Sequence, residues 1–269
     1  MNDLSFHQIA KEITYFSHKL DAKGFVANHD GNITVRFNDN FLATPTAISK
    51  GLMRDDWIIT LDKEGKKIAG PGNGKAFSEV KLHLKAYEVR PEAKAVIHAH
   101  PPFATTCGLL GNAITPHLAE AIISIGNYIP VVAMSLPGSE EQLRGVDTAL
   151  NEADVFMMSG NGVLAIGDSL EQAYLRLELL EHMAQINYYL EMSSRQDNKK
   201  ITTLQDNEIK SLLIKRAELG LGPKIKMNSS QAQSQYQYQY QSPSSSQSLP
   251  SADVLKTIIS QEIKKMLNK

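Results

Sequence analysis

Two histidines separated by one residue, His98 and His100, are the side chains in this sequence best suited to chemistry. They follow the apolar segment 95–97 and precede two prolines, which should end the strand. In a strand, residues i and i+2 share one face, so both imidazoles should emerge side by side. Two neutral imidazoles on a rigid backbone suit zinc or another divalent metal. The alternative is a half-exposed strand whose histidines bind nothing.

The segments around this pair predict a mixture of short strands and helices. Apolar runs and turn residues predict strands at 33–37, 41–43, 57–61, 93–100, 130–133, 155–158 and 163–166. Helical spacing of apolar residues predicts helices at 3–22, 78–90, 104–110, 119–125, 169–192 and 203–219, with Ser78 and Ser169 as N-caps. The order lacks regular βαβ alternation and a Gly-rich dinucleotide-binding motif. We therefore expect one α/β domain with a largely antiparallel or mixed sheet under helices.

The composition of the 269-residue chain limits the classes of protein to consider. The net charge of −1 gives no electrostatic reason to expect binding to nucleic acid or to an anionic membrane. No apolar run approaches the roughly 20 residues of a membrane-spanning helix, and the N-terminus lacks the pattern of a secretory signal. Cys107 is the only cysteine, which excludes an intrachain disulfide. We expect a soluble cytoplasmic protein.

The composition changes after residue 222. Residues 223–250 are dominated by Ser, Gln and Tyr, which offer too little aliphatic surface to offset chain entropy, so this segment is predicted to be a disordered linker. In residues 251–269, apolar side chains recur every three to four positions and predict an amphipathic helix. An isolated helix of this length is marginally stable in water, so we expect it to need a partner surface. Residues 1–222 would form the folded domain.

Four segments, taken in order, resemble the class II aldolase/adducin family. They are 28–36, which contains Gly-Asn-Ile-Thr-Val-Arg, 43–48 with Thr-Pro-Thr, 78–83 with Ser-Glu-Val-Lys-Leu-His, and the His-Ala-His-Pro sequence at 98–101. The resemblance covers residues 5–195, approximately. It implies a three-layer α/β/α domain around a mainly antiparallel sheet, and a metal-dependent enzyme that acts on a phosphorylated ketose.

The resemblance also implies a role for each matching residue. His98 and His100 would be two zinc ligands, and Glu79 would be the catalytic carboxylate beside the metal. The pocket for the substrate phosphate would be formed by Gly31, Asn32, Thr46 and Ser78. These roles have a physical basis, because backbone N–H groups in a turn and the N-terminus of a helix both attract anions. A bound zinc ion can also stabilise the negative charge that develops when a C–C bond of a ketose breaks.

Several positions depart from the family pattern. Asn161 stands where the family has its third zinc histidine, and we take it as the third metal-ligand position, although an amide oxygen is a weaker ligand than imidazole. Glu79 and His117 are alternative sources of the third ligand. Ala47 and Phe77 stand where the sugar-phosphate aldolases tend to carry Gly and Ser, which predicts weaker phosphate binding or a different substrate.

Together these features predict a zinc-dependent lyase of the class II aldolase type. It would cleave a deoxyketose 1-phosphate of the fuculose- or rhamnulose-phosphate type to dihydroxyacetone phosphate and lactaldehyde by retro-aldol chemistry, with Glu120 or His117 as the acid–base group at the aldehyde oxygen. Alternatives on the same fold are a sugar-phosphate epimerase, dehydratase or decarboxylase, or a non-catalytic adducin-like binding module. The joint presence of His98, His100 and Glu79 favours an enzyme, since a scaffold has no physical need for all three.

The predicted C-terminal helix resembles the encapsulation peptides of enzymes packaged in bacterial microcompartments. This implies shell proteins as partners of residues 251–269 and a location inside such a compartment. The alternatives are a helix that mediates oligomerisation and a helix that packs on its own domain. The family resemblance further implies a homotetramer with active sites near subunit contacts.

Overall fold

Eight strands of the described residues form one sheet, in the order β4-β3-β2-β1-β5-β8-β7-β6. The computed structural model describes residues 5–136, 138–197 and 201–223. The strands are β1 (Asn32–Phe37), β2 (Asn40–Ala43), β3 (Ile59–Leu61), β4 (Lys67–Ala69), β5 (Ala95–Ala99), β6 (Val131–Val132), β7 (Val155–Met158) and β8 (Val163–Gly167). Neighbouring strands pair antiparallel, except for the parallel pair β6 and β7. The mainly antiparallel sheet predicted from the sequence is confirmed.

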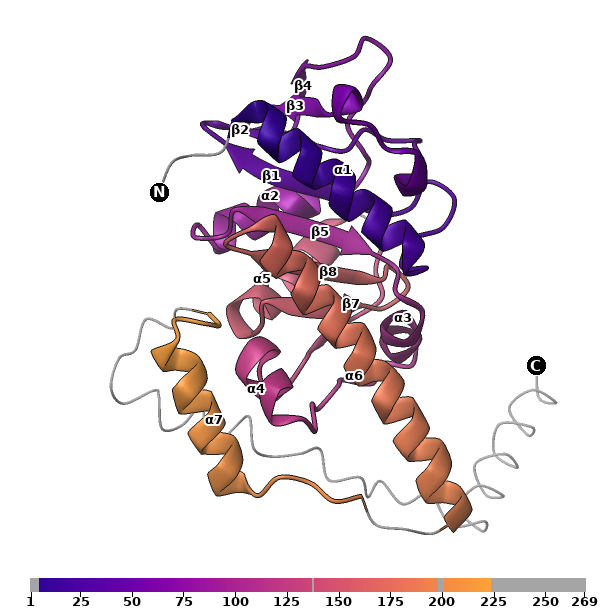
Figure 1. The fold of residues 1–269 in the computed structure, drawn as a ribbon, viewed down its shortest axis with the longest axis vertical. Helices are drawn as coiled ribbons and strands as arrows, with labels where there is room; N and C mark the ends of the chain where they lie inside the picture. Colours follow the sequence, from indigo (N-terminus) through magenta and orange to yellow (C-terminus); the bar gives the residue numbers. More distant parts are fainter. Residues whose placement is uncertain (1–4, 137, 198–200, 224–269) are drawn as a thin grey trace, which may run out of the picture. The chain divides into compact units, whose positions relative to one another are not determined.

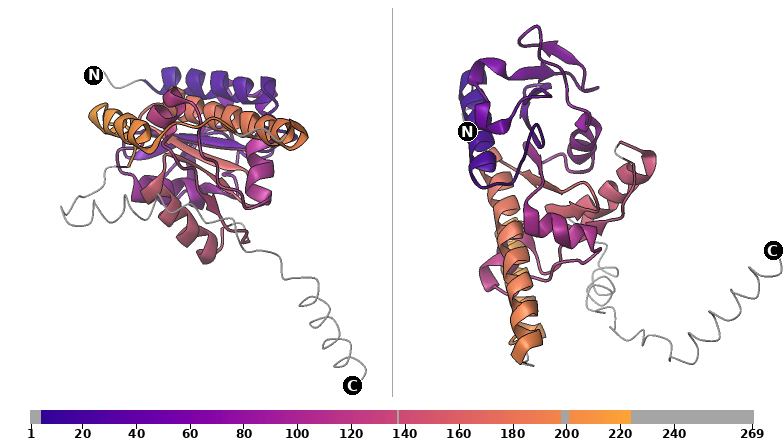
Figure 2. Two further views of the ribbon diagram at one scale, coloured as in Figure 1. Left: turned by 90° about the horizontal axis from the view of Figure 1, so that it is seen from below. Right: turned by 90° about the vertical axis from the view of Figure 1, so that its right-hand side faces the viewer.

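Helices cover both faces of this sheet and produce three layers (Figure 1; Figure 2). One face carries α1 (Phe6–Ala22) and α6 (Leu170–Asp197), and the other carries α2 (Val80–Val89) and α5 (Glu140–Glu152). The remaining described helices are α3 (Pro102–Leu109), α4 (Ala119–Ile125), α7 (Asp206–Glu218) and the short 3-10 helices η1 (Lys50–Leu52) and η2 (Asp55–Trp57). The predicted α/β/α arrangement is therefore confirmed. The predicted linker from residue 224 onward and the predicted helix at 251–269 lie outside the described residues.

The alternation of side chains along the central strands decides which polar residues can meet. On β5, Ile97 points into the hydrophobic cluster on the α1 and α6 side, whereas Val96 points into the cluster on the α2 and α5 side. By the same alternation, His98 faces α2. On the neighbouring strand β1, Ile33 belongs to the α1 side, so Asn32 also faces α2. The sheet thus directs His98 and Asn32 toward one helix.

The start of α2 differs from the prediction. The helix begins at Val80 with Glu79 in the N-cap position, and no side-chain hydrogen bond caps it. The prediction that Ser78 is the N-cap is therefore wrong, and Ser78 lies exposed in the preceding turn. The physical reason is the turn at Phe77, which is closed by the Val80 N–H donating to the Phe77 carbonyl at 3.4 Å. This turn delays entry into the helix by one residue.

Helix α5 is absent from the sequence prediction. Its N-cap Ser139 accepts a hydrogen bond from the Gln142 N–H at 3.2 Å, and Glu140 complements the helix dipole in the first turn. Val146 and Leu150 pack against the sheet. Ser139 is a recognisable N-cap residue in the sequence. The helix was nevertheless not predicted, because its few apolar residues are surrounded by polar ones.

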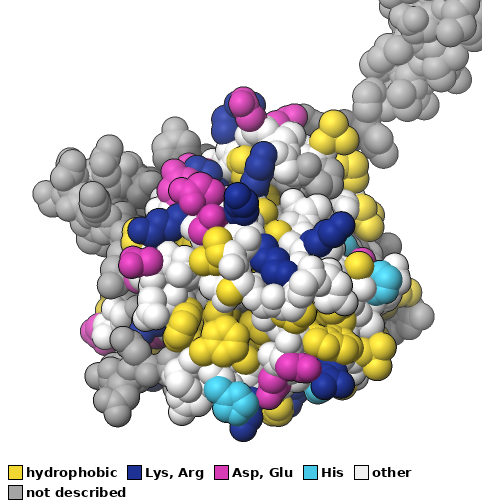
Figure 3. All heavy atoms as spheres, turned by 90° about the horizontal axis from the view of Figure 1, so that it is seen from above, with side chains coloured by type: hydrophobic (Ala, Val, Ile, Leu, Met, Phe, Trp, Pro, Cys, Tyr) yellow, Lys and Arg dark blue, Asp and Glu magenta, His cyan; other side chains and the backbone are white. Residues whose placement is uncertain are grey.

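No helix among the described residues is both long and apolar enough to cross a membrane. On the face shown in Figure 3, Lys and Arg side chains intermingle with Asp, Glu and hydrophobic side chains. That face therefore carries both signs of charge, in keeping with the net charge of −1 for the whole chain.

Candidate active site

The two histidines predicted to bind metal lie side by side at the end of β5. The Nε2 atoms of His98 and His100 are 3.1 Å apart, and their ring centroids are 4.9 Å apart. His98 is fully buried, and its Nδ1 lies 3.0 Å from the carbonyl oxygen of Val163 on β8. When Nδ1–H donates to a carbonyl, the Nε2 lone pair is available, which is the usual arrangement of a metal-binding histidine.

Glu79 approaches the same point from the N-terminus of α2. Its Oε1 lies 3.2 Å from His98 Nε2, and its Oε2 accepts a hydrogen bond from Asn32 Nδ2 at 3.0 Å. Burial raises the pKa of this carboxyl, but the hydrogen bond and charge of His98 outweigh it, helped by polar contacts with Asn32 and Asn161. The net result is a pKa well below the ordinary value, so Glu79 is ionised at neutral pH.

His98 Nε2 therefore faces two electron-rich groups, the Glu79 carboxylate and His100 Nε2. Their lone pairs would repel one another unless positive charge lies between them. A divalent cation bound there would supply that charge. Nitrogen and oxygen ligands about 2.0–2.1 Å from one zinc ion lie about 3.3–3.4 Å apart in a tetrahedral site. The observed separations of 3.1 and 3.2 Å are close to that spacing.

Among the described residues, no group of three or more His, Cys, Asp and Glu side chains is arranged to hold a metal ion. The fit to a metal therefore rests on donor chemistry. The imidazole of His100 and the ionised carboxylate of Glu79 both lie next to His98 Nε2. The Val163 carbonyl fixes the orientation of His98, and Asn32 fixes that of Glu79. This donor set suits a divalent cation of the zinc type.

Asn161 is brought to this cluster by a tight turn between β7 and β8. Gly160 and Gly162, on either side of it, have left-handed backbone with φ of 72° and 65°. A Cβ at Gly162 would lie 2.6 Å from the His100 ring, so only glycine lets the turn pass so close. Asn161 is 8% exposed, and its Nδ2 has no partner with hydrogen-bonding geometry among the described residues. The predicted ligand position is thus buried beside the histidines, with an amide nitrogen that forms no hydrogen bond among the described residues.

A polar ladder joins β1 to α2 behind the cluster. Asn32 and Thr34 lie about 6.6 Å apart along one face of the strand, and Glu79 and His83 lie about 6 Å apart along the helix. Because these spacings match, Asn32 meets Glu79 and Thr34 meets His83, with Thr34 Oγ1 2.8 Å from His83 Nδ1. Tyr87, one further turn along α2, places its Oη 2.9 Å from Thr34 Oγ1. The ladder holds Glu79 at the correct height above the sheet.

Counting protons along this ladder assigns the tautomer of His83. Tyr87 Oη donates to the Thr34 carbonyl at 2.9 Å, so Thr34 Oγ1 donates to Tyr87 and accepts from His83 Nδ1–H. Burial, reinforced by the charge of His98, lowers the pKa of His83 to about 3 and keeps the ring neutral. Its Nε2 is left as a buried acceptor with no partner among the described residues.

The residues predicted to bind phosphate are placed unequally. Gly31 has φ of 71°, and a Cβ there would lie 3.0 Å from the His98 carbonyl oxygen, so the turn passes directly over the histidine strand. Thr46 and Ser78 are both exposed in loops. The Thr46 N–H donates to the carbonyl of Lys75 at 3.0 Å, which joins its loop to the segment that leads to Ser78.

Asn32, the fourth residue predicted to bind phosphate, lies on β1 and not in a loop. It pairs with His98 in the β1–β5 ladder, where the alternation of antiparallel hydrogen bonds directs its N–H toward the His98 carbonyl. Its side chain binds Glu79. Asn32 is therefore placed to hold Glu79, and its N–H is not free to line an anion pocket.

The predicted alternative groups lie apart from this cluster. His117 is half-buried between α3 and α4, and Glu120 is exposed in the first turn of α4. Within the described part of the chain, neither forms a hydrogen bond or ion pair with Glu79. Thr34 and Tyr87 were not predicted as parts of the site, although the spacing of residues 79, 83 and 87 on one helix face was a usable signal.

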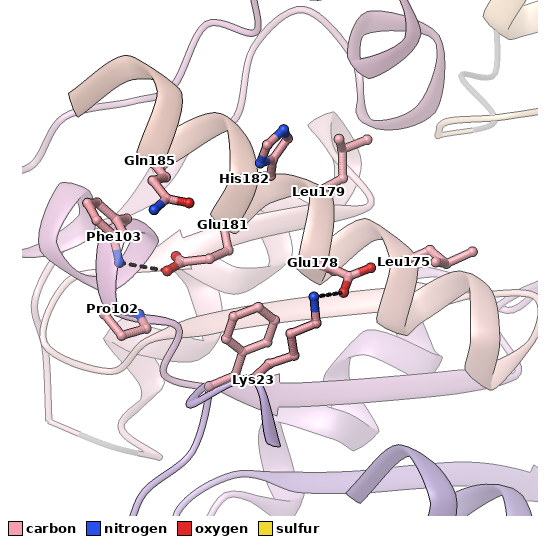
Figure 4. Close-up of a pocket in the computed structure, with 10 residues that line it drawn as sticks. Lys23, Pro102, Phe103, Leu175, Glu178, Leu179, Glu181, His182 and Gln185 are labelled. Carbon is pink, nitrogen blue, oxygen red and sulfur yellow. Dashed lines mark hydrogen bonds and ion pairs between the residues drawn. The ribbon is translucent and has the colours of Figure 1, made fainter. Parts of the chain in front are cut away.

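A cavity of about 680 Å³ is lined by the end of α1, the start of α3, and α6 (Figure 4). Phe25 lines it, and the carbonyl of Phe25 accepts a hydrogen bond from the His100 N–H at 2.8 Å. Figure 4 shows Glu181 directed at the start of α3, where it accepts from the N–H groups of Phe103 and Ala104 at 3.0 and 2.8 Å. These contacts fix the backbone on both sides of His100.

The sequence matches the Class II Aldolase and Adducin N-terminal domain over residues 11–188. This chain belongs to the class II aldolase/adducin family. The resemblance carried by the four short segments is therefore confirmed, and the three-layer fold is the one expected for it.

Named relatives in this family of enzymes differ in the reaction they catalyse. The 3-oxo-tetronate 4-phosphate decarboxylase of Haemophilus influenzae is 30% identical over 196 residues, which cover 71% of this chain and 89% of that protein. The L-fuculose phosphate aldolase of Escherichia coli (strain K12) is 28% identical over 215 residues, covering 80% and 97%. The structure of YgbL from Klebsiella pneumoniae superimposes with a TM-score of 0.70 at 25% identity, covering 78% of this chain and 100% of that one.

Proposed function

We propose that this protein is a metal-dependent lyase that cleaves a deoxyketose 1-phosphate, of the fuculose- or rhamnulose-phosphate type, to dihydroxyacetone phosphate and lactaldehyde. The observation that carries the proposal is the meeting of three donor groups at His98 Nε2, with His100 at 3.1 Å and the ionised Glu79 at 3.2 Å. Similarity to an L-fuculose phosphate aldolase along 97% of that enzyme supports the choice of reaction.

His98 and His100 would hold a zinc ion or another divalent metal, with Glu79 or Asn161 as the third ligand. When bound, the ion would supply Lewis-acid stabilisation for the negative charge that develops on the ketose oxygens. The Val163 carbonyl orients His98, and Asn32 orients Glu79. These side chains would therefore need little rearrangement to act.

Glu79 would move the proton on the three-carbon fragment. In the cleavage direction the C3–C4 bond breaks, the aldehyde leaves, and C3 of the remaining fragment needs a proton. Glu79 would carry that proton to C3, because its carboxylate lies at the donor cluster and is held there by Asn32. The C4 hydroxyl loses its proton as it becomes the aldehyde carbonyl, and His117 or Glu120 would accept that proton.

The phosphate of the substrate would bind between the turn at Gly31 and the loops that contain Thr46 and Ser78. The Gly31 turn lies against the His98 carbonyl, so a phosphate bound there would place the reacting carbons of the ketose near the histidines. The exposed hydroxyls of Thr46 and Ser78 would donate to phosphate oxygens.

A second candidate is the decarboxylation of a phosphorylated 3-oxo acid. The Haemophilus influenzae relative named as such a decarboxylase is 30% identical to this chain. Loss of carbon dioxide also leaves a carbanion next to a carbonyl, so the same donor cluster and the same proton transfer by Glu79 would serve it.

The test is turnover by the purified full-length protein with L-fuculose 1-phosphate, L-rhamnulose 1-phosphate and 3-oxo-tetronate 4-phosphate, each offered separately. We expect dihydroxyacetone phosphate from one of the ketose phosphates, abolished by a chelator and restored by zinc. Release of carbon dioxide from the third substrate alone would instead establish the decarboxylase. Metal-free protein without turnover of any of them would reject both and favour an adducin-like binding module.

We also propose that the protein is a homotetramer and that residues 251–269 dock on the shell of a bacterial microcompartment. The amphipathic pattern of those residues and the linker before them support this proposal. Deletion of residues 228–269 should leave turnover intact and abolish co-purification with shells, while sedimentation reports the oligomer. Loss of activity on truncation, together with a full-length protein that never enters shells, would contradict it.

A further inference from the structure

A buried lysine lies beneath the two loops assigned to phosphate binding. Lys50, the first residue of η1, is only 1% exposed. Its Nζ donates to the carbonyl of Ile48 at 2.9 Å and to that of His29 at 3.4 Å. Within the described residues, no carboxylate lies within ion-pair distance of this ammonium group. A fully buried lysine nearly always has a charged partner, so Lys50 is unusual in lacking one.

The two carbonyls belong to different loops, and each loop has an unusual backbone. One loop, 27–31, leads into β1 and ends at Gly31, and the other, 44–49, follows β2 and contains Thr46. Asn28 in the first loop has φ of 51°, and Ala47 in the second has φ of 59°. Non-glycine residues rarely adopt this conformation, and they occur most often where the surrounding structure imposes it, as at ligand-binding sites.

The charge on Lys50 is poorly neutralised. Burial lowers the pKa of Lys50 to about 8, and the negative charge of Asp30 opposes this only in part. The ammonium group is therefore still mainly protonated at pH 7. Two of its three N–H donors are engaged by the carbonyls, which leaves one available. An anion bound between the two loops would supply the missing countercharge.

We propose that Lys50 is a positioning residue of the substrate-phosphate pocket. Its ammonium group holds loop 27–31 against loop 44–49, and it supplies the positive charge that the bound phosphate completes. The inference rests on the proposed function and adds to it a residue that recognises the phosphorylated class of substrate. It also offers a source of phosphate affinity in a pocket where Ala47 and Phe77 bring no hydrogen-bonding side chain.

The effect of the Lys50 charge can be measured separately from its contacts with the loops by using Lys50→Gln. Glutamine keeps an N–H donor for the carbonyls but carries no charge. Lys11→Gln is the matched control, because Lys11 is exposed on α1, away from both loops, and its loss changes the net charge equally. By calorimetry with inorganic phosphate, we expect Lys50→Gln to weaken binding by about tenfold or more. The KM for the phosphorylated ketose should rise similarly, with kcat changed by less than about threefold. Lys11→Gln should match the wild type in both.

Lys50→Met provides a second variant, since a hydrophobic chain of similar volume tolerates burial better than an unpaired amide. It should lose phosphate binding like Lys50→Gln while its thermal unfolding midpoint reports whether it is folded. Unchanged phosphate affinity in both folded variants would overturn the inference, as would a wild type that binds no phosphate. Calorimetry does not require turnover. If phosphate binding depends on Lys50 but the protein cleaves no ketose, only the proposed function is rejected. Ketose cleavage with an unchanged KM in Lys50→Gln would reject only the role of Lys50.

Discussion

Two buried polar clusters lie at opposite ends of β7 and β8, and they differ in how completely their polar atoms are paired. At one end, Asp154 is fully buried and contacts the guanidinium groups of Arg90, Arg176 and Arg216 at 2.7, 3.0 and 2.7 Å. At the other end, the Asn161 turn lies beside the histidines. The first cluster joins α7 to the rest of the domain, whereas the second joins β1 to α2 and still leaves buried polar atoms without a partner among the described residues.

The comparison shows which buried polar groups maintain the fold. In the Asp154 cluster, Arg216 also donates to the carbonyls of Ile123 and Ser124, and every fully buried side-chain N or O atom of the cluster has a partner within the described part of the chain. Around the histidines, by contrast, lie three of the seven buried side-chain atoms that have no partner in the described residues: Asn32 Oδ1, His83 Nε2 and Asn161 Nδ2. Buried polar groups are rarely left unpaired. Their concentration at one end of the sheet indicates a site that a ligand completes.

The largest effect is expected where pairing is complete. Asp154→Asn would leave three buried guanidinium groups without their shared carboxylate, so the free energy of unfolding should fall by about 3–5 kcal/mol. Urea unfolding of the full-length protein measures this, with Asp147→Asn on α5 as a control that should change stability by less than about 0.5 kcal/mol. Equal midpoints for Asp154→Asn and wild type would show that the cluster is not structural.

Glu79→Gln should act on turnover without acting on the fold. The amide keeps the shape of the side chain but cannot carry a proton to carbon, so kcat should fall by about 100-fold or more. Glu88→Gln, an exposed change on the same helix, is the control and should keep wild-type kcat. Equal activity of Glu79→Gln and wild type would remove Glu79 from the mechanism.

The neutral His83, whose buried Nε2 has no partner among the described residues, should make stability depend on pH. Because burial lowers its folded pKa from 6.5 to about 3, the unfolded chain binds more protons in this window and stability rises with pH through it. Between pH 6.5 and pH 5 the wild type should lose about 2 kcal/mol from this group. His83→Gln should lack that part of the slope in urea unfolding at the two pH values. Identical slopes would show that His83 is protonated in the folded protein.

The smallest effect is expected at Asn161, where an imidazole would replace the unused amide. Asn161→His should tighten zinc binding by about tenfold or more, since imidazole is the better ligand. Asn161→Ala serves as the comparison and should bind zinc no more tightly than wild type in a competition titration with a chelator. The same affinity in all three proteins would mean that position 161 is not a metal-ligand position.

The sequence was enough to predict the parts of this molecule that local pattern controls. Strand alternation correctly predicted that His98 and His100 lie side by side. The Asp154 cluster escaped prediction because its three arginines come from positions 90, 176 and 216, which only the tertiary fold brings together. Lys50 escaped for the same reason, since nothing in its local sequence distinguishes a buried lysine from an exposed one. Ser78 was misplaced because the turn at Phe77 shifts the helix start by one residue.

Zinc titration of the chelator-stripped, full-length protein tests the central claim most directly. Calorimetry should find one zinc site per chain in the wild type and none in the double variant His98→Ala, His100→Ala. Both proteins should remain folded, because these histidines do not take part in the Asp154 cluster that ties α7 to the domain. A wild type that binds no zinc, or a double variant that binds it equally well, would contradict the assignment of this end of the sheet as a metal-dependent active site.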